Sequence, residues 1–165
     1  MQNDLHEQSN LRLFNRLPQD QCERVFASEM CDIEPEFLGF VGIYERLSQI
    51  IPIDWDVIDL GCAYAPQAWF FENHKSYIGV DLGELNRRFS APNTVHHKMT
   101  IQTFVCMQAR DFDPRFTFAI CSYVPPWHGD NIKMVREAFQ NVFTYYPASR
   151  ERPDKAFIRK LKEIA

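Results

Sequence analysis

The chain has 165 residues and a mass of 19.5 kDa, which is the size of one domain. Apolar residues make up 45% of it and charged residues 24%, and the formal net charge is −4. This composition is typical of a globular protein with its own core. It argues against a general binder of nucleic acid or anionic membrane, which would need a cationic face.

The cysteines and the amino-terminal residues predict the cellular compartment. Five cysteines form no Cys-x-x-Cys pair and no His/Cys ligand spacing, which favours reduced thiols and no metal site. The polar, acidic start of the chain lacks a signal-peptide pattern, and no apolar run approaches the ~18 residues that span a bilayer. We therefore expect a cytoplasmic protein without a membrane partner.

Both ends of the chain differ in character from the centre. Residues 1–34 form a predicted helical or irregular extension, in which the apolar residues of 11–17 indicate a short helix ended by Pro18. Residues 150–165 form a predicted helix opened by Pro153, with six basic and three acidic residues. A solvated helix face is the simplest interpretation. A segment that contacts nucleic acid stays open as the alternative, although the acidic net charge argues against it.

The first half of the core, which we expect over 35–146, begins with a helix. Apolar residues at helical spacing predict this helix over 35–50, ended before Pro52. The run 55–60 is short, apolar and followed by Gly61, which is typical of a buried strand entering a turn. A helix over 67–73 and a second buried strand over 76–81 follow. Residues 55–81 thus form a strand–turn–helix–strand unit.

The second half continues the alternation. A weaker strand is predicted over 94–98, then a helix over 101–108 with Thr100 as its N-cap. The strongest strand, 115–122, is stopped by Pro125 and Pro126. A helix after residue 130 and a strand over 142–146 complete the core.

Strands that alternate with helices predict an α/β fold with a parallel sheet and helices on both faces. Ligands of such sheets bind beyond the carboxyl ends of the strands. The segments at that edge are 59–66, 81–84, 99–101 and 121–128. Candidate functional residues are expected there.

The turn after the first strand and the end of the second strand carry the strongest chemical signal. Gly61 allows a sharp turn and a close approach by a ligand. Asp81 ends the second strand 20 residues later, where a carboxylate can accept hydrogen bonds from ribose hydroxyls. The spacing predicts a site for a ribose-bearing cofactor. An ordinary tight turn followed by an exposed aspartate is the alternative.

Three segments resemble motifs of one enzyme family. The run VIDLGCAYA is similar to the first motif of class I S-adenosylmethionine-dependent methyltransferases, YIGVDL to their second motif, and FTFAICSYVPPW to their fourth strand. The resemblance covers about 35–146. It implies a three-layer Rossmann-like fold, with about five mostly parallel strands in the order 3-2-1-4-5. It also implies S-adenosylmethionine as a small-molecule methyl donor, with an unidentified substrate.

The resemblance implies a set of cofactor-binding residues and assigns no catalytic residue. Asp59 is the acidic residue of the first motif, and the next three motif positions would face the methionine portion. Asp81 would bind the ribose hydroxyls, and Leu82 would pack on the adenine. Two residues after the third strand would flank the adenine, and two at the end of the fourth strand would lie near the sulfonium. The full set is Asp59, Gly61, Cys62, Ala63, Asp81, Leu82, Thr100, Ile101, Ser122 and Tyr123.

The sequence also departs from the family. Ala63 and Ala65 stand where the family usually has glycines, so two methyl groups are expected to intrude on the loop. The segment 97–100 lacks the acidic residue that often reads the adenine, and about 18 residues follow Pro147 where the family has two further strands. A methyltransferase-like fold that no longer catalyses, and serves as a binding or scaffolding module, is therefore the alternative function.

Narrower resemblances fit less well. DLGCA is similar to the first motif of RNA ribose 2′-O-methyltransferases, but Ser122-Tyr123-Val124 replaces their catalytic aspartate. Pro125-Pro126-Trp127 resembles the motif of amino-group methyltransferases, with Val124 in place of the Asn or Asp. A nicotinamide-binding G-x-G-x-x-G motif would need glycines at 63 and 66, where Ala63 and Pro66 stand.

Three further side chains are weaker candidates. His128 is the best-placed general base, although a lone loop histidine is more often merely exposed. His96 and His97 follow one another on a strand, so their side chains point to opposite faces and cannot jointly bind a metal. Tyr44 is expected to face the core, with the cofactor's carboxylate end as an alternative contact.

Overall fold

A computed structural model describes residues 8–9, 12–13, 15–26, 41–122 and 129–145. The expected helix over 150–165 lies outside the described residues, as do the predictions for Tyr123 and His128. The described residues before Pro18 are mostly helical, as expected. A further helix, α2 (Gln19–Phe26), was not predicted.

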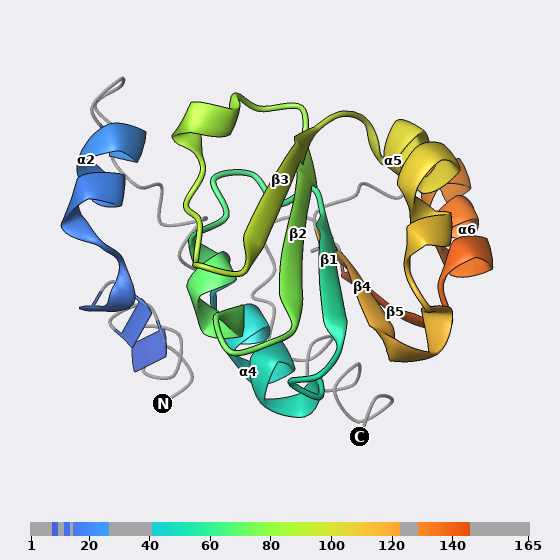
Figure 1. Cartoon of the computed structure of the whole chain (residues 1–165), viewed down its shortest axis with the longest axis horizontal. Coiled ribbons are helices and arrows are strands. Elements are labelled where there is room, and N and C mark those ends of the chain that lie inside the picture. Colours follow the sequence, from blue (N-terminus) through green and yellow to red (C-terminus); the bar gives the residue numbers. More distant parts are fainter. Residues whose placement is uncertain (1–7, 10–11, 14, 27–40, 123–128, 146–165) are drawn as a thin grey trace.

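The centre of the molecule is a five-stranded parallel sheet in the order β3-β2-β1-β4-β5 (Figure 1). This confirms the predicted α/β, Rossmann-like class and strand order. The five strands are β1 (Asp56–Leu60), β2 (Ser76–Asp81), β3 (Thr94–Lys98), β4 (Thr117–Ser122) and β5 (Asn141–Tyr145).

Each face of the sheet has its own apolar core. On one face, Val57, Tyr77 and Phe118 pack with residues of α2, α4 (Val41–Ile50) and the 3-10 helix η1 (Pro66–Phe71). On the other face, Ile58 and Val80 pack with residues of α5 (Ile101–Gln108) and α6 (Gly129–Ala138). Because strand side chains alternate between faces, the buried strands carry apolar residues at successive positions. The helices on both faces confirm the three-layer arrangement.

Several elements differ in their ends from the prediction. Residues 66–71 form a 3-10 helix instead of the α-helix expected over 67–73; Ala65 precedes it in a left-handed conformation, and Pro66 occupies its first turn. Strand β4 begins at Thr117, since the 3-10 helix η4 (Pro114–Phe116), capped by Asp113, precedes it. Thr100 caps α5 as predicted: its side chain accepts a hydrogen bond from the Thr103 N–H (3.0 Å).

Helix α2 is tied to the segment that follows β2. The Gln21 side chain pairs with the main chain of Ser90, donating to its carbonyl (2.8 Å) and accepting from its N–H (3.0 Å). Trp69 of η1 donates to the same side-chain oxygen (3.4 Å). Arg24 donates to the Arg88 carbonyl (2.8 Å). The amino-terminal helix therefore joins segments that are far apart in the sequence.

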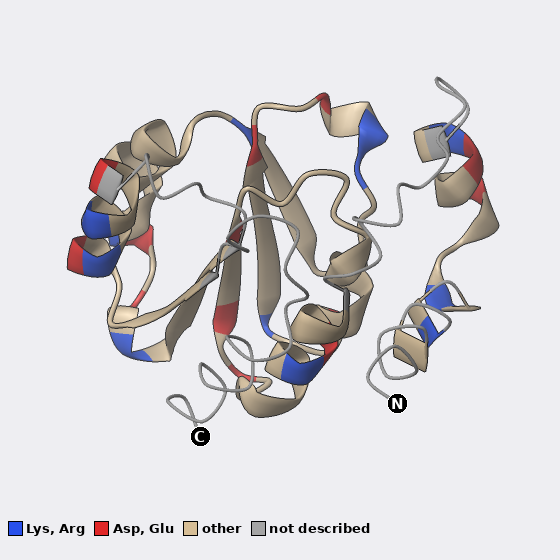
Figure 2. Cartoon of the chain, turned by 180° about the vertical axis from the view of Figure 1, so that it is seen from behind, with Lys and Arg blue, Asp and Glu red and all other residues tan. Residues whose placement is uncertain are grey.

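Lys and Arg are interspersed with Asp and Glu on the helices beside the sheet (Figure 2). Within the described ranges, no helix is long and apolar enough to cross a membrane.

Candidate functional site

The loop after β1 adopts a left-handed backbone at three alternate residues. Gly61, Ala63 and Ala65 have φ values of 84°, 50° and 55°. Such values cost a non-glycine residue about 1–2 kcal/mol, and residues held in this way cluster at functional sites. The two alanines thus keep the backbone conformation that a glycine would adopt. The Ala65 methyl belongs to the buried core, whereas Ala63 is exposed, so only Ala63 can place a methyl on the open side of the loop.

Main-chain and side-chain bonds fix this loop to the end of β2. The N–H groups of Gly61 and Cys62 donate to the Val80 carbonyl (2.8 and 3.2 Å). The Ala63 N–H donates to Asp81 Oδ2 (3.0 Å). The loop after one strand and the carboxylate at the end of its neighbour therefore lie together, as the sequence predicted for this edge of the sheet.

Asp81 also organises the turn that follows it. Its Oδ1 accepts a hydrogen bond from the Gly83 N–H (2.9 Å), and its carbonyl accepts one from the Met99 N–H (3.1 Å). Ionised carboxylates offer about four lone-pair sites, so both Asp81 oxygens retain acceptor capacity. The next side chain, Leu82, is 64% exposed. An acceptor and an apolar side chain thus stand side by side at this edge.

Asp59, the acidic residue of the first motif, lies at the centre of a buried polar cluster under the loop. It is fully buried, and it accepts hydrogen bonds from the hydroxyls of Tyr77 and Tyr44 and from Gln67 Nε2 (2.9 Å to Oδ2). Gln67 Nε2 also donates to the Cys62 carbonyl (3.0 Å). The Gln67 side chain therefore links the Asp59 carboxylate to the main chain of the loop.

Burial sets the protonation of this polar cluster. It raises the pKa of Asp59 to about 6; the three hydrogen bonds partly oppose this rise, and the nearby Asp81 adds to it. Burial also raises the pKa of the Cys62 thiol well above its ordinary value, so the thiol stays protonated. An uncharged thiol is a poor nucleophile, so Cys62 serves as a packing residue under the loop.

The two histidines of β3 lie on opposite faces of the strand, as predicted. His96 contacts the Phe89 carbonyl through Nε2 (2.7 Å), and burial lowers its pKa. His97 packs on the Phe104 ring of α5, with the centroids 5.5 Å apart. Among the described residues, no group of three or more His, Cys, Asp or Glu side chains could hold a metal.

The structure brings three of the four predicted segments together. The Ala63 N–H joins the first segment to Asp81, and the Met99 N–H joins the start of 99–101 to the Asp81 carbonyl. In that last segment the Thr100 side chain is engaged as a helix cap, and Ile101 is half-buried against the second core. Ser122 ends β4 and pairs with Tyr145 in register. The loop after it lies outside the described ranges.

Sequence reasoning missed three residues that support this site. Tyr77 and Gln67 hold the buried carboxylate of Asp59, and Arg88 holds the turn after β2. Strand alternation places Tyr77 on the same face of β2 as Asp81, and this is the one feature of the sequence that could have pointed to Tyr77. Nothing in the sequence marks Arg88 as buried.

No protein-family model matches the chain, and no curated protein matches it either. Among solved structures, the chain is similar to a protein from Anaeromyxobacter dehalogenans that has been proposed to be a type II methyltransferase. The two are 16% identical, with a TM-score of 0.46. The match covers 72% of this chain and 53% of that protein, so this chain spans about half its length. The fold assignment stands on the strand order and register of the chain itself.

Proposed function

We propose that the chain binds S-adenosylmethionine at the carboxyl ends of β1 and β2 and is a methyltransferase with an unidentified substrate. The observation that carries this proposal is the Asp81 carboxylate, which lies against the left-handed loop 61–65 and accepts a hydrogen bond from its Ala63 N–H. This combination of turn and carboxylate suits a ribose with two free hydroxyls.

The residues present fit such a cofactor. Asp81 keeps lone pairs for hydroxyl donors, and the exposed Leu82 offers an apolar surface to an adenine. The buried Ala65 methyl stays away from the open side of the loop, where only Ala63 can place one. We infer that Gly61, Cys62 and Ala63 would lie along the methionine portion through their backbone, while Asp59 would support them through Gln67.

When bound, S-adenosylmethionine supplies a methyl group that is already activated for transfer. The protein then has to hold the acceptor in line with that methyl group and keep water away, and alignment alone provides much of the rate. A catalytic base is needed only for protonated acceptors. Ser122, Tyr123, Thr100 and Ile101 remain predicted contacts of the cofactor.

A binding module without catalysis is the second candidate. The observation that favours it is that both Asp81 oxygens and both Asp59 oxygens already accept hydrogen bonds from the protein. Such a carboxylate pair can hold a loop without any ligand. The two candidates differ in turnover.

Thermal unfolding with and without S-adenosylhomocysteine tests the cofactor site. Ligand at 100 times its dissociation constant should add about 2.7 kcal/mol, which raises the melting temperature by about 5–10 °C for a domain of this size. We expect Asp81→Ala to abolish the rise because the ribose hydroxyls lose their acceptor. Glu84→Ala, which removes an exposed carboxylate of the same segment, should keep it. Equal shifts in both variants would remove Asp81 from the site.

Turnover is tested with S-adenosylmethionine that carries a labelled methyl group. The protein is incubated with a cell extract, which is then separated into protein, nucleic acid and small molecules. Label that enters one fraction, and fails to enter it with Asp81→Ala, supports the enzyme. Binding of S-adenosylhomocysteine without any incorporation of label would favour the module.

A further inference from the structure

Arg88 is a fully buried cation at the end of the 3-10 helix η2 (Leu85–Arg87). In the part of the chain that the structure describes, its guanidinium bonds only main-chain carbonyls. Nη2 donates to the carbonyls of Asp81 and Gly83 (both 2.8 Å), and Nη1 donates to those of His97 (3.0 Å) and Gly79 (3.4 Å). Its Nε is buried without a partner.

Burying a charge without an opposite charge is costly, and hydrogen bonds to carbonyl dipoles offset part of that cost. The planar fork of arginine suits several acceptors at once, which a lysine ammonium on a flexible stem cannot reproduce. All four acceptors of Arg88 lie on β2, on β3 or in the turn after β2. The charge is thus placed where two parallel strands end beside the candidate site.

The contacts of Arg88 converge on the turn that carries Asp81. Its Nη2 bridges the carbonyls of residues 81 and 83, while the Asp81 side chain accepts the Gly83 N–H. The main chain around Asp81 is therefore fixed from two sides, and this sets the direction of its carboxylate.

The segment that contains Arg88 also contacts the loop after β1. The N–H of the next residue, Phe89, donates to the Tyr64 carbonyl (2.8 Å). Helix α2 holds the same segment through the bond from Arg24 to the Arg88 carbonyl. One buried segment thus joins both loops of the site.

We propose that Arg88 is a positioning residue that holds the Asp81–Gly83 turn in the conformation in which Asp81 meets the ribose of the cofactor. The inference rests on the proposed function, and it assigns to Arg88 no contact with the cofactor. Its action on the turn does not need a ligand, so the turn and the ribose can be tested separately.

Amide hydrogen exchange of the ligand-free protein tests the turn. The reporter is Met99, whose N–H donates to the Asp81 carbonyl that Arg88 also bonds, and the reference is Ile58 in the centre of the sheet. We expect Arg88→Lys to speed exchange at Met99 about tenfold more than at Ile58, because the turn opens locally. Arg110→Lys, at an exposed site, should change neither. Equal changes at Met99 and Ile58 would overturn the inference.

Calorimetric titration with S-adenosylhomocysteine tests the link to the ribose. Arg88→Lys should weaken binding about tenfold or more in the wild-type background, and clearly less in an Asp81→Asn background, because Arg88 acts through Asp81. Losses that simply add would show a purely structural role and overturn the inference. If wild-type protein binds no S-adenosylhomocysteine, the proposed function and the ribose role of Arg88 both fail. The exchange at Met99 still decides whether Arg88 holds the turn.

Discussion

Replacing the buried Asp59 by asparagine is expected to remove a loss of stability that the wild-type protein suffers as the pH rises. Burial raises the pKa of Asp59 from 3.8 to about 6 in the folded chain. The folded state therefore binds the proton more tightly than the unfolded state. The free energy of unfolding should fall between about pH 3 and pH 7 by about 3 kcal/mol from this group, at 1.36 kcal/mol per pKa unit.

Urea unfolding of wild type and Asp59→Asn between pH 3.5 and 7.5 measures this effect. The difference between the two proteins cancels the titration of most other groups, so it should rise by about 3 kcal/mol over that range in favour of the variant. Asp111→Asn, at an exposed carboxylate, should show a small and nearly constant difference. A constant difference for Asp59→Asn as well would mean that Asp59 titrates normally.

A methyl group at Gly79 is expected to destabilise the fold strongly. Gly79 pairs with Asp59 in register, and a Cβ there would clash with His96 Nδ1 and lie 2.9 Å from Cys62 Sγ. Neither neighbour can easily move, since the His96 ring contacts the Phe89 carbonyl and the Cys62 side chain is buried in the core. Overpacking of this kind typically lowers the free energy of unfolding by about 1–3 kcal/mol. Because Gly79→Ala creates two such close contacts, we expect it to lower the free energy of unfolding by about 3 kcal/mol.

Gly83 provides the matched control for Gly79. The nearest atom to a Cβ at Gly83 is Asp81 Oδ1 at 3.5 Å, an ordinary contact, and its φ lies outside the left-handed region. Gly83→Ala should therefore change the free energy of unfolding by less than about 0.5 kcal/mol. Equal effects of the two variants in urea unfolding would show that the close packing at Gly79 is absent.

Much of the fold was predictable because strands β1 and β2 are buried on both faces. Strand β1 is buried at all five positions, so a short apolar run between turn signals was enough to place it. Helix α2 was missed because the apolar residues of Gln19–Phe26 are few, and contacts with later segments hold the helix in place. Long-range contacts of this kind leave no local pattern in a sequence.

The site was predictable in part. Asp81 and the loop after β1 were found because parallel strands end at a common edge, and the structure joins them through the Ala63 N–H. The burial of Asp59 was not foreseen, since its hydroxyl donors, Tyr44 and Tyr77, come from separate elements. Both alanines were expected to intrude on the loop, but the Ala65 methyl is buried in the core and only Ala63 is exposed. The left-handed backbone of both residues depends on tertiary surroundings, which no local sequence pattern shows.

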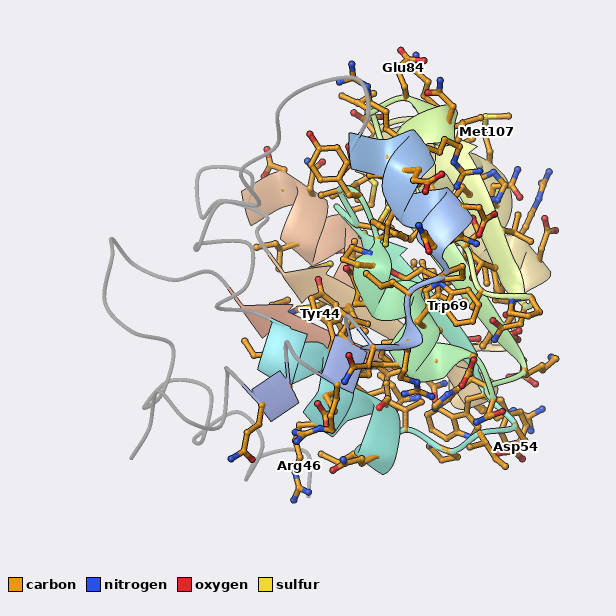
Figure 3. All side chains as sticks on the ribbon, turned by 90° about the vertical axis from the view of Figure 1, so that its left-hand side faces the viewer. Tyr44, Arg46, Asp54, Trp69, Glu84 and Met107 are labelled. Atoms are coloured by element: carbon orange, nitrogen blue, oxygen red, sulfur yellow. The ribbon has the colours of Figure 1, made fainter. Side chains whose placement is uncertain are left out.

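The amide NMR spectrum of the protein with saturating S-adenosylhomocysteine tests the central claim most directly. Glu84, in the segment after β2, and Asp54, before β1, lie at opposite ends of the molecule, so the spectrum can separate the two edges of the sheet (Figure 3). Binding should move the amide signals of 61–65, 81–83 and 99–101 most, and leave those around Asp54 unchanged. An unchanged spectrum, or changes confined to the edge around Asp54, would contradict a cofactor site at the carboxyl ends of β1 and β2.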